Sequence, residues 1–386
     1  MKRNNNIHLA STDTCTGCAA CVSVCPTGSI SMKEDREGFL QPHIDIKSCI
    51  GCHKCEKTCP VITPIKIPTD FETQAYAAIN KDEAVRMRSS SGGMFHALAK
   101  WTIEQGGVVF GARFNDQWEV VHDYTETIEG IEPFMRSKYV QSRIGDTFKQ
   151  ARQFLDAGRQ VLFVGTPCQI GGLKAYLKKG YDNLIAVDFI CHGVPSPKVW
   201  RQYLKWMRKD DQILDVNFRD KTKGWLGFQQ VIITTTTTTT RENQMENVYF
   251  RGFLRDVYLR KSCYGCPFKT IHRISDITLA DAWGIQHCCP ELHDDKGTSY
   301  ILIHTERGEM VSQAISDGIL RKKLQINGLI IHNPSIVKSV ARPQRRTTYL
   351  SAFNFGGFNF AKNYIDKDAI IVRAVRKIRK IFGIKA

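Results

Sequence analysis

The chain has 386 residues, of which 42% are hydrophobic and 24% charged, so wholesale disorder and collagen-like structure are excluded. Its length suggests two or three domains. Two features depart from ordinary usage: there are 14 cysteines, and 54 Lys and Arg against 38 Asp and Glu give a formal net charge of +16. Because the chain is long and its cysteines are spaced as metal ligands, a small secreted protein held by disulfides is excluded.

The ends of the chain bear on its compartment. Residues 1–14 contain no apolar stretch long enough for a signal peptide, and no window approaches the roughly 18 apolar residues of a membrane-spanning helix. We therefore expect a soluble cytoplasmic protein, because a reducing compartment keeps thiolates available as ligands. Residues 366–386 form a basic amphipathic segment that could lie on anionic lipid at the inner face of the membrane or pack on the protein.

A cysteine pattern occurs twice near the start. Residues 15–26 read CTGCAACVSVCP and residues 49–60 read CIGCHKCEKTCP. The run C-x2-C-x2-C-x3-C-P is typical of bacterial two-cluster ferredoxins, in which the fourth cysteine of each run binds the other run's cluster. The repeat therefore predicts one 4Fe–4S cluster on Cys15, Cys18, Cys21 and Cys59, and another on Cys49, Cys52, Cys55 and Cys25. A zinc site, the alternative, does not call for this third cysteine and terminal Cys-Pro.

The predicted architecture is an α+β ferredoxin-like N-terminal domain followed by an α/β domain with a mainly parallel sheet. Pro60, Pro64 and Pro68 favour an extended linker between a first domain at residues 1–66 and a second at residues 71–345. The second domain alternates strand and helix patterns, which implies βαβ units. Strands are expected at 75–80, 108–114, 160–165 and 184–191, and helices at 94–105, 144–156 and 173–179.

Four further cysteines could form a third site. Cys168 follows one predicted strand and Cys191 ends the next, so in a single βαβ unit both lie at the carboxyl edge of the sheet. Cys263 and Cys266 form a C-x2-C pair that can grip a metal from one loop. Together the four fit a third 4Fe–4S cluster, although buried small side chains, half a zinc site or a redox dithiol remain alternatives. The last two cysteines cannot easily face one site and are predicted to be structural: Cys288 and Cys289.

A relay of single electrons needs a group that converts them into two-electron chemistry, and flavins do this. No G-x-G-x-x-G motif occurs, so an ordinary dinucleotide fingerprint is absent. The substitute is a run at a predicted helix start that could hold a pyrophosphate or merely cap the helix: Ser89, Ser90, Ser91, Gly92 and Gly93.

Other polar residues are candidates for the same site. Lys138 and Tyr139 could contact a phosphate or a ring, or lie in an exposed loop. Asp281 follows an apolar strand and could bond a ribose or flavin, or be an ordinary turn residue. His192 is a candidate proton donor or a polar loop histidine.

Taken in order, the motifs SSSGG, SKYVQS, GTPCQIGGL, CHGVPSP and SCYGCPF…DITLADAWGI resemble the coenzyme F-420 (deazaflavin) hydrogenase/dehydrogenase beta-subunit family, with a two-cluster ferredoxin domain in front. The likeness extends to about residue 330. It implies FAD in the α/β domain beside an iron–sulfur cluster, with the four dispersed cysteines as ligands and the serine–glycine run, Lys138 and Tyr139 at the flavin. Related members reduce deazaflavin, chlorophyll derivatives or other partners, and some resemble components of bacterial surface-polysaccharide pathways.

The sequence thus predicts an iron–sulfur flavoprotein oxidoreductase. Electrons would move between a ferredoxin-like carrier, the clusters and FAD, with two-electron reduction or oxidation of a small organic molecule or a deazaflavin-type coenzyme. The alternative is a non-catalytic electron-transfer subunit of a larger redox complex. The positive charge is accompanied by no nucleic-acid-binding motif, so no nucleic-acid partner is expected.

Overall fold

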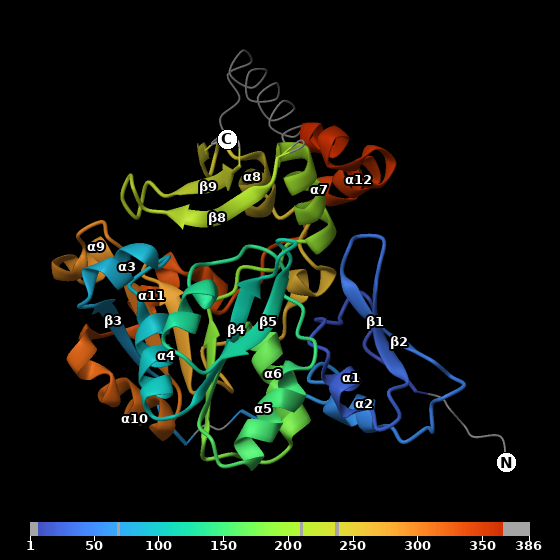
Figure 1. Ribbon diagram of the computed structural model, residues 1–386, viewed down its shortest axis with the longest axis horizontal. Helices are drawn as coiled ribbons and strands as arrows, with labels where there is room; N and C mark the ends of the chain where they lie inside the picture. Colours follow the sequence, from blue (N-terminus) through green and yellow to red (C-terminus); the bar gives the residue numbers. More distant parts are fainter. Residues whose placement is uncertain (1–6, 68–69, 209–210, 236–238, 366–386) are drawn as a thin grey trace, which may run out of the picture.

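The computed structural model describes residues 7–67, 70–208, 211–235 and 239–365, so the predicted basic helix at 366–386 lies outside the described residues. Figure 1 shows an N-terminal domain, a central body built on a large sheet, and a smaller sheet with its own helices. Within the described ranges, no helix has the length and hydropathy needed to cross a membrane.

The N-terminal domain repeats its backbone as it repeats its cysteines. It consists of helix α1 (Ala20–Val24), the antiparallel hairpin β1 (Ile30–Glu34) and β2 (Leu40–Ile44), and helix α2 (Lys54–Thr58). The residues before the two helices, Ala19 and His53, adopt left-handed φ values of 59° and 55°. They stand at the same place in each run of the repeat, so the local conformation follows the sequence pattern.

The central body is built on a mixed eight-stranded sheet. Its order is β13 (Ile319–Leu324), β3 (Gln74–Asn80), β12 (Ser299–Ile303), β11 (Ile277–Asp281), β7 (Leu184–Phe189), β6 (Val161–Val164), β4 (Val108–Phe114) and β5 (Val120–Thr125). Only the neighbours β4, β6, β7 and β11 pair in parallel. The predicted mainly parallel sheet is therefore right only at the centre. The edges run antiparallel, and at one of them a five-residue turn returns β4 directly into β5.

Helices cover both faces of this sheet. The core of one face includes α4 (Met94–Glu104) and α10 (Glu306–Ala314), and that of the other includes α5 (Thr147–Asp156) and α6 (Pro167–Leu177). Helix α6 begins six residues before the predicted start at 173, because Thr166 and Gln169 form a capping box and Pro167 occupies the first turn. Cys168 consequently lies in a helix rather than in a loop.

The N-terminal domain packs directly on the body. Cys18, Ala19 and Ala20 share one hydrophobic core with residues of α5 and α6, including Phe148 and Leu173. Figure 1 shows α1 and α2 beside these two helices. The cysteine repeat therefore packs on the helices that cover this face of the central sheet.

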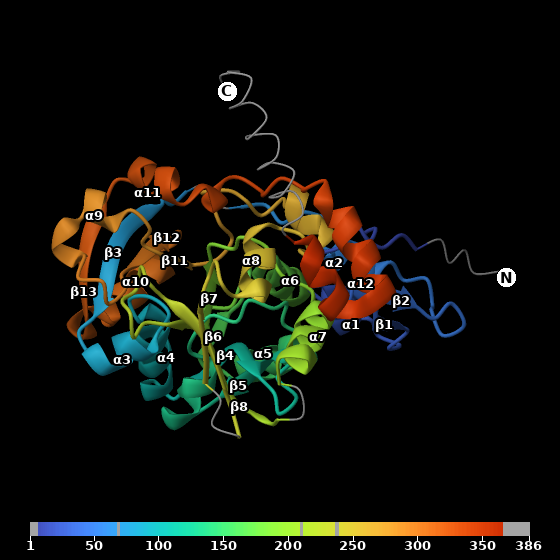
Figure 2. The same cartoon turned by 90° about the horizontal axis from the view of Figure 1, so that it is seen from above.

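A separate hydrophobic core lies between the smaller sheet and its helices. The antiparallel strands β8 (Ile213–Asp220), β9 (Gln229–Thr234) and β10 (Thr239–Asn243) pack with α7 (Pro197–Arg208), α8 (Val248–Leu254) and α12 (Arg345–Ala361). Seen from above in Figure 2, α12 lies toward the N-terminal domain, and β3 and β13 lie at the opposite end. The short helices α3 (Glu83–Arg88), α9 (Ile285–Cys288) and α11 (Ile326–His332) lie at that opposite end.

Candidate metal centres

The four dispersed cysteines line one pocket at the carboxyl edge of the central strands, here called the body pocket. Cys168 comes from the first turn of α6, Cys191 follows β7, and Cys263 and Cys266 come from the 3-10 helix Lys261–Gly265 and the residue after it. A βαβ unit and a separate loop, distant in sequence, thus present four thiols to one space, as open α/β sheets do for their ligands.

The thiols of the body pocket influence one another. Burial, with smaller contributions from the neighbouring cysteine thiolates, raises the pKa of Cys191 and of Cys263 to about 12. Burial and the thiolates of Cys266 and Cys191 likewise raise the pKa of Cys168. Four such thiols cannot all ionise here without a positive group between them, so the donor set fits a metal cluster.

Three cations also line the body pocket: Arg260, Lys269 and Arg273. The Lys269 ammonium donates to the carbonyl oxygen of Cys191. Arg273 is buried and lies 3.6 Å from Asp188. Sequence reasoning missed all three, although Lys269 follows the C-x2-C pair by three residues and a basic neighbour of cysteine ligands is a usable signal.

A second pocket lies in the N-terminal domain and is here called the dicluster pocket. Its four cysteines are Cys15, Cys18, Cys21 and Cys59. Burial raises the pKa of Cys18 to about 11, with further contributions from Cys15 and Cys59, and it also raises the pKa of Cys21. These are the four residues of the first predicted cluster, and they include Cys59 from the other run.

The second predicted set of N-terminal cysteines lies nearer to solvent. Cys52 is the only exposed cysteine among the fourteen, all of which the structure describes. Burial raises the pKa of Cys55 to about 11. Burial alone would raise the pKa of Cys25, but hydrogen bonds from Thr27 and its neighbours lower it.

Single-ion sites have a different geometry. In the described part of the chain, no three His, Cys, Asp or Glu side chains are grouped so that they could hold one metal ion. A tetrahedral zinc ion would draw four sulfurs to about 3.8 Å from one another, given Zn–S bonds of about 2.3 Å. The cysteines of a 4Fe–4S cluster each bind a different iron, so the wider cysteine pockets suit a cluster better.

The serine–glycine run begins α4 as predicted, but its polar groups are already bonded to protein. Gly93, with a φ of 84°, precedes the helix. The three hydroxyls are engaged as follows: Ser89 Oγ donates to Val85 O over 2.8 Å, Ser91 Oγ donates to Thr298 O over 2.6 Å, and Ser90 Oγ accepts from Ser137 N over 2.7 Å. A β-carbon at position 92 would lie 2.5 Å from Ala78 O, so Gly92 is required by packing. The observed bonds are those of a structural helix start.

A buried arginine links two of the other predicted residues. Arg219 Nη1 donates to Tyr139 Oη over 3.2 Å and to Asp281 Oδ2 over 2.9 Å. Its Nε and Nη2 have no hydrogen-bond partner in the described part of the chain. Lys138 donates to the carbonyls of Met135 and Arg136, and burial lowers the pKa of its ammonium to about 7. Arg219 was not foreseen from the sequence.

The two predicted catalytic residues lie in different places. His192 lines the body pocket, and its Nε2 lies 2.6 Å from Asp256 Oδ1. Asp281 pairs with Arg219 instead. The ring of Phe253 lies 5.0 Å from the rings of both His192 and Tyr139, so this phenylalanine stands between the two groups. Cys288 and Cys289 line neither pocket, and Cys289 is fully buried.

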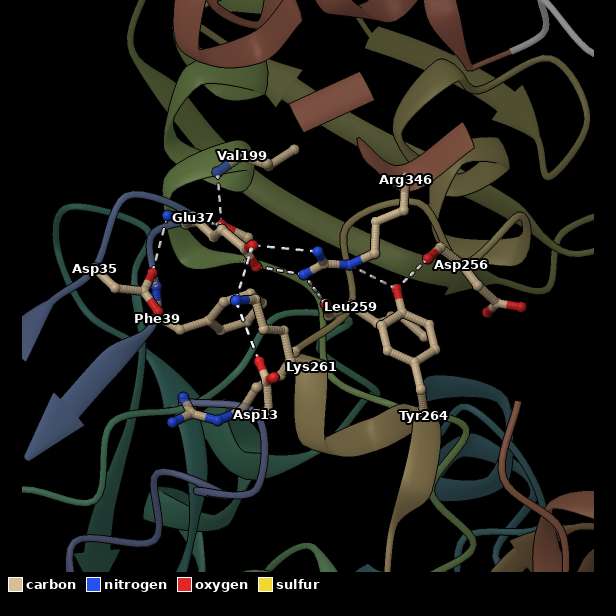
Figure 3. A network of polar contacts seen from close by, with 12 residues as sticks. Asp13, Asp35, Glu37, Phe39, Val199, Asp256, Leu259, Lys261, Tyr264 and Arg346 are labelled. Carbon is tan, nitrogen blue, oxygen red and sulfur yellow. Dashed lines mark hydrogen bonds and ion pairs between the residues drawn. The ribbon is translucent and has the colours of Figure 1, made fainter. Parts of the chain in front are cut away.

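An ion-pair cluster ties the hairpin of the N-terminal domain to the segment that carries Cys263 and Cys266 (Figure 3). Both Nη atoms of Arg346, from α12, donate to the carboxylate of Glu37. The Nε of Arg346 donates to Tyr264 Oη over 3.1 Å. Lys261 lies 3.8 Å from Glu37 and 3.3 Å from Asp13. Because Tyr264 lies between Cys263 and Cys266 in sequence, this cluster positions one wall of the body pocket.

Comparison with known proteins identifies two segments. Residues 158–325 match the family described as the C terminus of the coenzyme F420 hydrogenase/dehydrogenase beta subunit, and residues 14–62 match the 4Fe-4S dicluster domain. The chain is 22% identical over 321 residues to a subunit of the F(420)H(2) dehydrogenase of Methanosarcina mazei, covering 79% of this chain and 83% of that protein. It is 32% identical over 74 residues to a ferredoxin-like protein in the nif region of Trichormus variabilis, covering 18% of this chain and 64% of that protein.

One similar solved structure comes from the F420-reducing [NiFe] hydrogenase complex of Methanosarcina barkeri. It has a TM-score of 0.45 and 18% identity, and the match covers 83% of this chain and 97% of that chain. The chain is therefore similar to the C-terminal part of the coenzyme F420 hydrogenase/dehydrogenase beta subunit over residues 158–325, and to the 4Fe-4S dicluster domain over residues 14–62.

Proposed function

We propose that this protein is an iron–sulfur electron-transfer subunit of an F420 dehydrogenase- or hydrogenase-type redox complex. The observation that carries the proposal is the contact between two cysteine-lined pockets, one in the dicluster domain and one at the carboxyl edge of the body sheet. Thr16 lines both pockets. This proposal is the predicted alternative; the sequence argument ranked a catalytic oxidoreductase first.

The dicluster cysteines would hold two 4Fe–4S clusters in the crossed pattern: Cys15, Cys18, Cys21 and Cys59 for one, and Cys25, Cys49, Cys52 and Cys55 for the other. Cys168, Cys191, Cys263 and Cys266 would hold a third. When bound, such clusters supply single-electron transfer. The chain itself contributes buried thiols, which shield the sites from water, and cations, which offset the thiolate charge of the body pocket.

The exposed edge of the dicluster domain is where we place the exchange of electrons with a redox partner. Cys52 is exposed there, and Ile46, Ile50 and Ile62 present 58%, 45% and 42% of their surfaces to solvent. Lys47, Lys54 and Lys57 are exposed on the same segment. An apolar centre with basic side chains around it suits an acidic one-electron carrier of the ferredoxin class.

A finer proposal is FAD as the two-electron group. It rests on the family resemblance and on Arg219, whose unpaired, buried Nε and Nη2 could donate to an anionic or carbonyl group beside Tyr139. On this proposal His192 and Asp281 would act on an organic small molecule or a deazaflavin-type coenzyme. A place in a surface-polysaccharide pathway stays a prediction from the resemblance alone, as does a cytoplasmic location.

Iron and flavin analysis tests these proposals separately. Anaerobically purified protein should contain about twelve irons per chain, falling to about eight in Cys263→Ser, whereas the matched Cys288→Ser variant, outside both pockets, should keep about twelve. About eight irons in the unmutated protein would contradict the third site. Flavin content should fall in Arg219→Gln but not in Arg241→Gln, an arginine of the exposed pair with Asp220. Fully iron-loaded protein without flavin would remove FAD and leave the electron-transfer proposal standing.

A further inference from the structure

The dicluster pocket and the body pocket are separated by very little protein. Thr16, next to Cys15, lines both. Helix α6 spans the two sites: Cys168 lies in its first turn, and Gly172 lies four residues further along, about 6 Å up the same helix face. A β-carbon at position 172 would lie 2.8 Å from Cβ and 2.9 Å from Sγ of Cys18. Glycine at this place allows the dicluster cysteine to approach the helix that carries a body cysteine.

The exposure of the cysteines orders the three sites. Cys52, of the other dicluster set, is exposed, whereas Cys18 is buried and shares a core with residues of α5 and α6. The Cys52 set therefore lies toward solvent, and the Cys18 set lies toward the body.

Arg260 holds this junction together. It is 1% exposed, and its Nε donates to the carbonyl of Cys15 over 2.6 Å. Its Nη2 donates to Leu40 O and Gln41 Oε1, and its Nη1 donates to Gln141 Oε1, all within 3.1 Å. Gln141 in turn donates to Thr16 O over 3.0 Å. The backbone carbonyl of Arg260 accepts from the N–H of Cys263. Arg260 thus bonds the backbone of a cysteine from each pocket, and through Gln141 it is linked to Thr16 in the wall between them.

We infer that electrons pass between the dicluster domain and the body through the site of Cys15, Cys18, Cys21 and Cys59, across the wall at Thr16, and that Arg260 is the positioning residue for this step. The inference rests on the proposed function, because it requires clusters in both pockets. With clusters held by both sets of cysteines, one electron would pass from one site to the other, and no bond would be made or broken. The set that includes Cys52 is then the port for the external carrier rather than the contact with the body.

Cysteine variants of the full chain test the order of the sites. Cys52→Ser should disable the outer site and leave the middle site next to the body site. In the fully reduced protein, electron paramagnetic resonance should then still detect the magnetic interaction between these two clusters. Cys18→Ser should disable the middle site and leave two non-interacting signals. Interaction retained in Cys18→Ser but lost in Cys52→Ser would overturn the inference. About eight irons in the unmutated protein would instead contradict the proposed third site, on which the inference rests.

Positioning by Arg260 is tested in the Cys52→Ser background. Arg260→Lys keeps a cation at the pocket but cannot keep the four-way contact, so the interaction should be lost while iron stays near eight per chain. The matched Arg307→Lys variant, an arginine that donates to the carbonyls of Tyr181 and Leu184 away from both pockets, should leave the spectrum unchanged. An unchanged spectrum in Arg260→Lys would overturn the role of this residue.

Gly172→Ala perturbs the same junction from helix α6. It provides an independent test if Arg260→Lys fails to fold. A methyl group there must displace Cys18, so the signal of the middle site should shift or its iron should be lost. Gly180→Ala is the matched control, because a β-carbon at position 180 meets nothing within 4 Å. Equal behaviour of the two alanine variants would contradict the close approach on which the inference depends.

Discussion

The dicluster pocket and the body pocket present four cysteines each, but the chain builds them differently. Three cysteines of the dicluster pocket stand within seven residues, with left-handed residues such as Ala19 setting the turns. The body pocket takes its cysteines from α6, from the end of β7 and from a loop more than seventy residues further on. The first site depends on local conformation, whereas the second depends on the whole sheet and on the contacts that hold its loop.

Their walls differ as well. Besides its cysteines, the dicluster pocket is lined largely by apolar side chains such as Met32, Pro42 and Val61. The body pocket is lined by Arg260, Lys269 and Arg273. Thiolates facing cations are stabilised in their charged form, and a further electron is more easily accepted there. The comparison suggests that the body site has the higher reduction potential and receives electrons from the dicluster domain.

The largest effect on stability is expected from removing Arg346, which supports the loop of the body pocket. Arg346→Met removes the buried partner of the partly exposed Glu37, so the free energy of unfolding should fall by about 3 kcal/mol. Because Tyr264 loses its contact with Arg346, the body iron should be lost before the dicluster iron. Anaerobic denaturant unfolding with iron analysis measures both.

The matched control for Arg346 is Arg201→Met. Arg201 pairs with Glu34 of the same hairpin, but both side chains are more than a third exposed, so the loss should be below about 1 kcal/mol. Equal destabilisation by the two variants would show that the hairpin, and not the loop of the body pocket, determines the effect.

The next largest effect is expected at acid pH, which should destabilise the body more than the dicluster domain. Burial lowers the pKa of His122 to about 4 and of His304 to about 3, and both belong to the body. An unfolded histidine takes up a proton near pH 6.5, so below that pH the unfolded state binds more protons and stability falls. Each histidine should cost about 1.4 kcal/mol per pH unit between about pH 6 and its folded pKa.

Unfolding free energies at pH 6.0 and 5.0 measure this slope. His304→Gln should reduce it by about 1.4 kcal/mol per pH unit, whereas His43→Gln, on the exposed side of the dicluster hairpin, should not. The same slope in all three proteins would mean that the body is no more acid-sensitive than the dicluster domain.

The same difference explains what could be predicted from sequence. The dicluster cysteines follow a fixed spacing, and the strand predicted at 108–114 is observed as β4 with the same bounds. The convergence of Cys168 and Cys191 followed from one βαβ unit, which is observed as parallel β6 and β7. The antiparallel edges were missed for two reasons. Strands β12 and β13 pair with β3, more than two hundred residues earlier in the chain, which no local pattern specifies, whereas β5 follows β4 in a hairpin whose turn was not recognised.

The residues that join the two pockets were also missed. Arg260 and Arg346 bond to backbone and side chains more than two hundred residues away, so their partners cannot be read from neighbouring sequence. The start of α6 is a different case, since Thr166, Pro167 and Gln169 form a recognisable capping pattern. That pattern could have placed Cys168 on a helix.

A smaller effect is expected at the outer edge of the dicluster domain. If an acidic carrier docks beside Cys52, the double variant Lys54→Glu, Lys57→Glu should slow its electron donation by about tenfold at low ionic strength, with the difference shrinking as salt is added. Stopped-flow bleaching of the cluster absorbance measures the rate. Lys323→Glu, on β13 at the far end of the sheet, should have no such effect. A salt-independent loss would contradict electrostatic docking.

The smallest effect tests whether the cations that line the body pocket raise its reduction potential. Lys269 is buried beside Cys191, and its positive charge favours the reduced state of a cluster in the body pocket. Lys269→Gln keeps a hydrogen-bond donor near the Cys191 carbonyl but removes the charge, so the body potential should fall by tens of millivolts, on the order expected for one screened charge. The dicluster potentials should stay constant, and so should all potentials in Lys205→Gln, on the exposed side of α7. If potentiometric titration finds the body signal unmoved, the cations do not set the direction of electron flow, and burial differences between the pockets must do so.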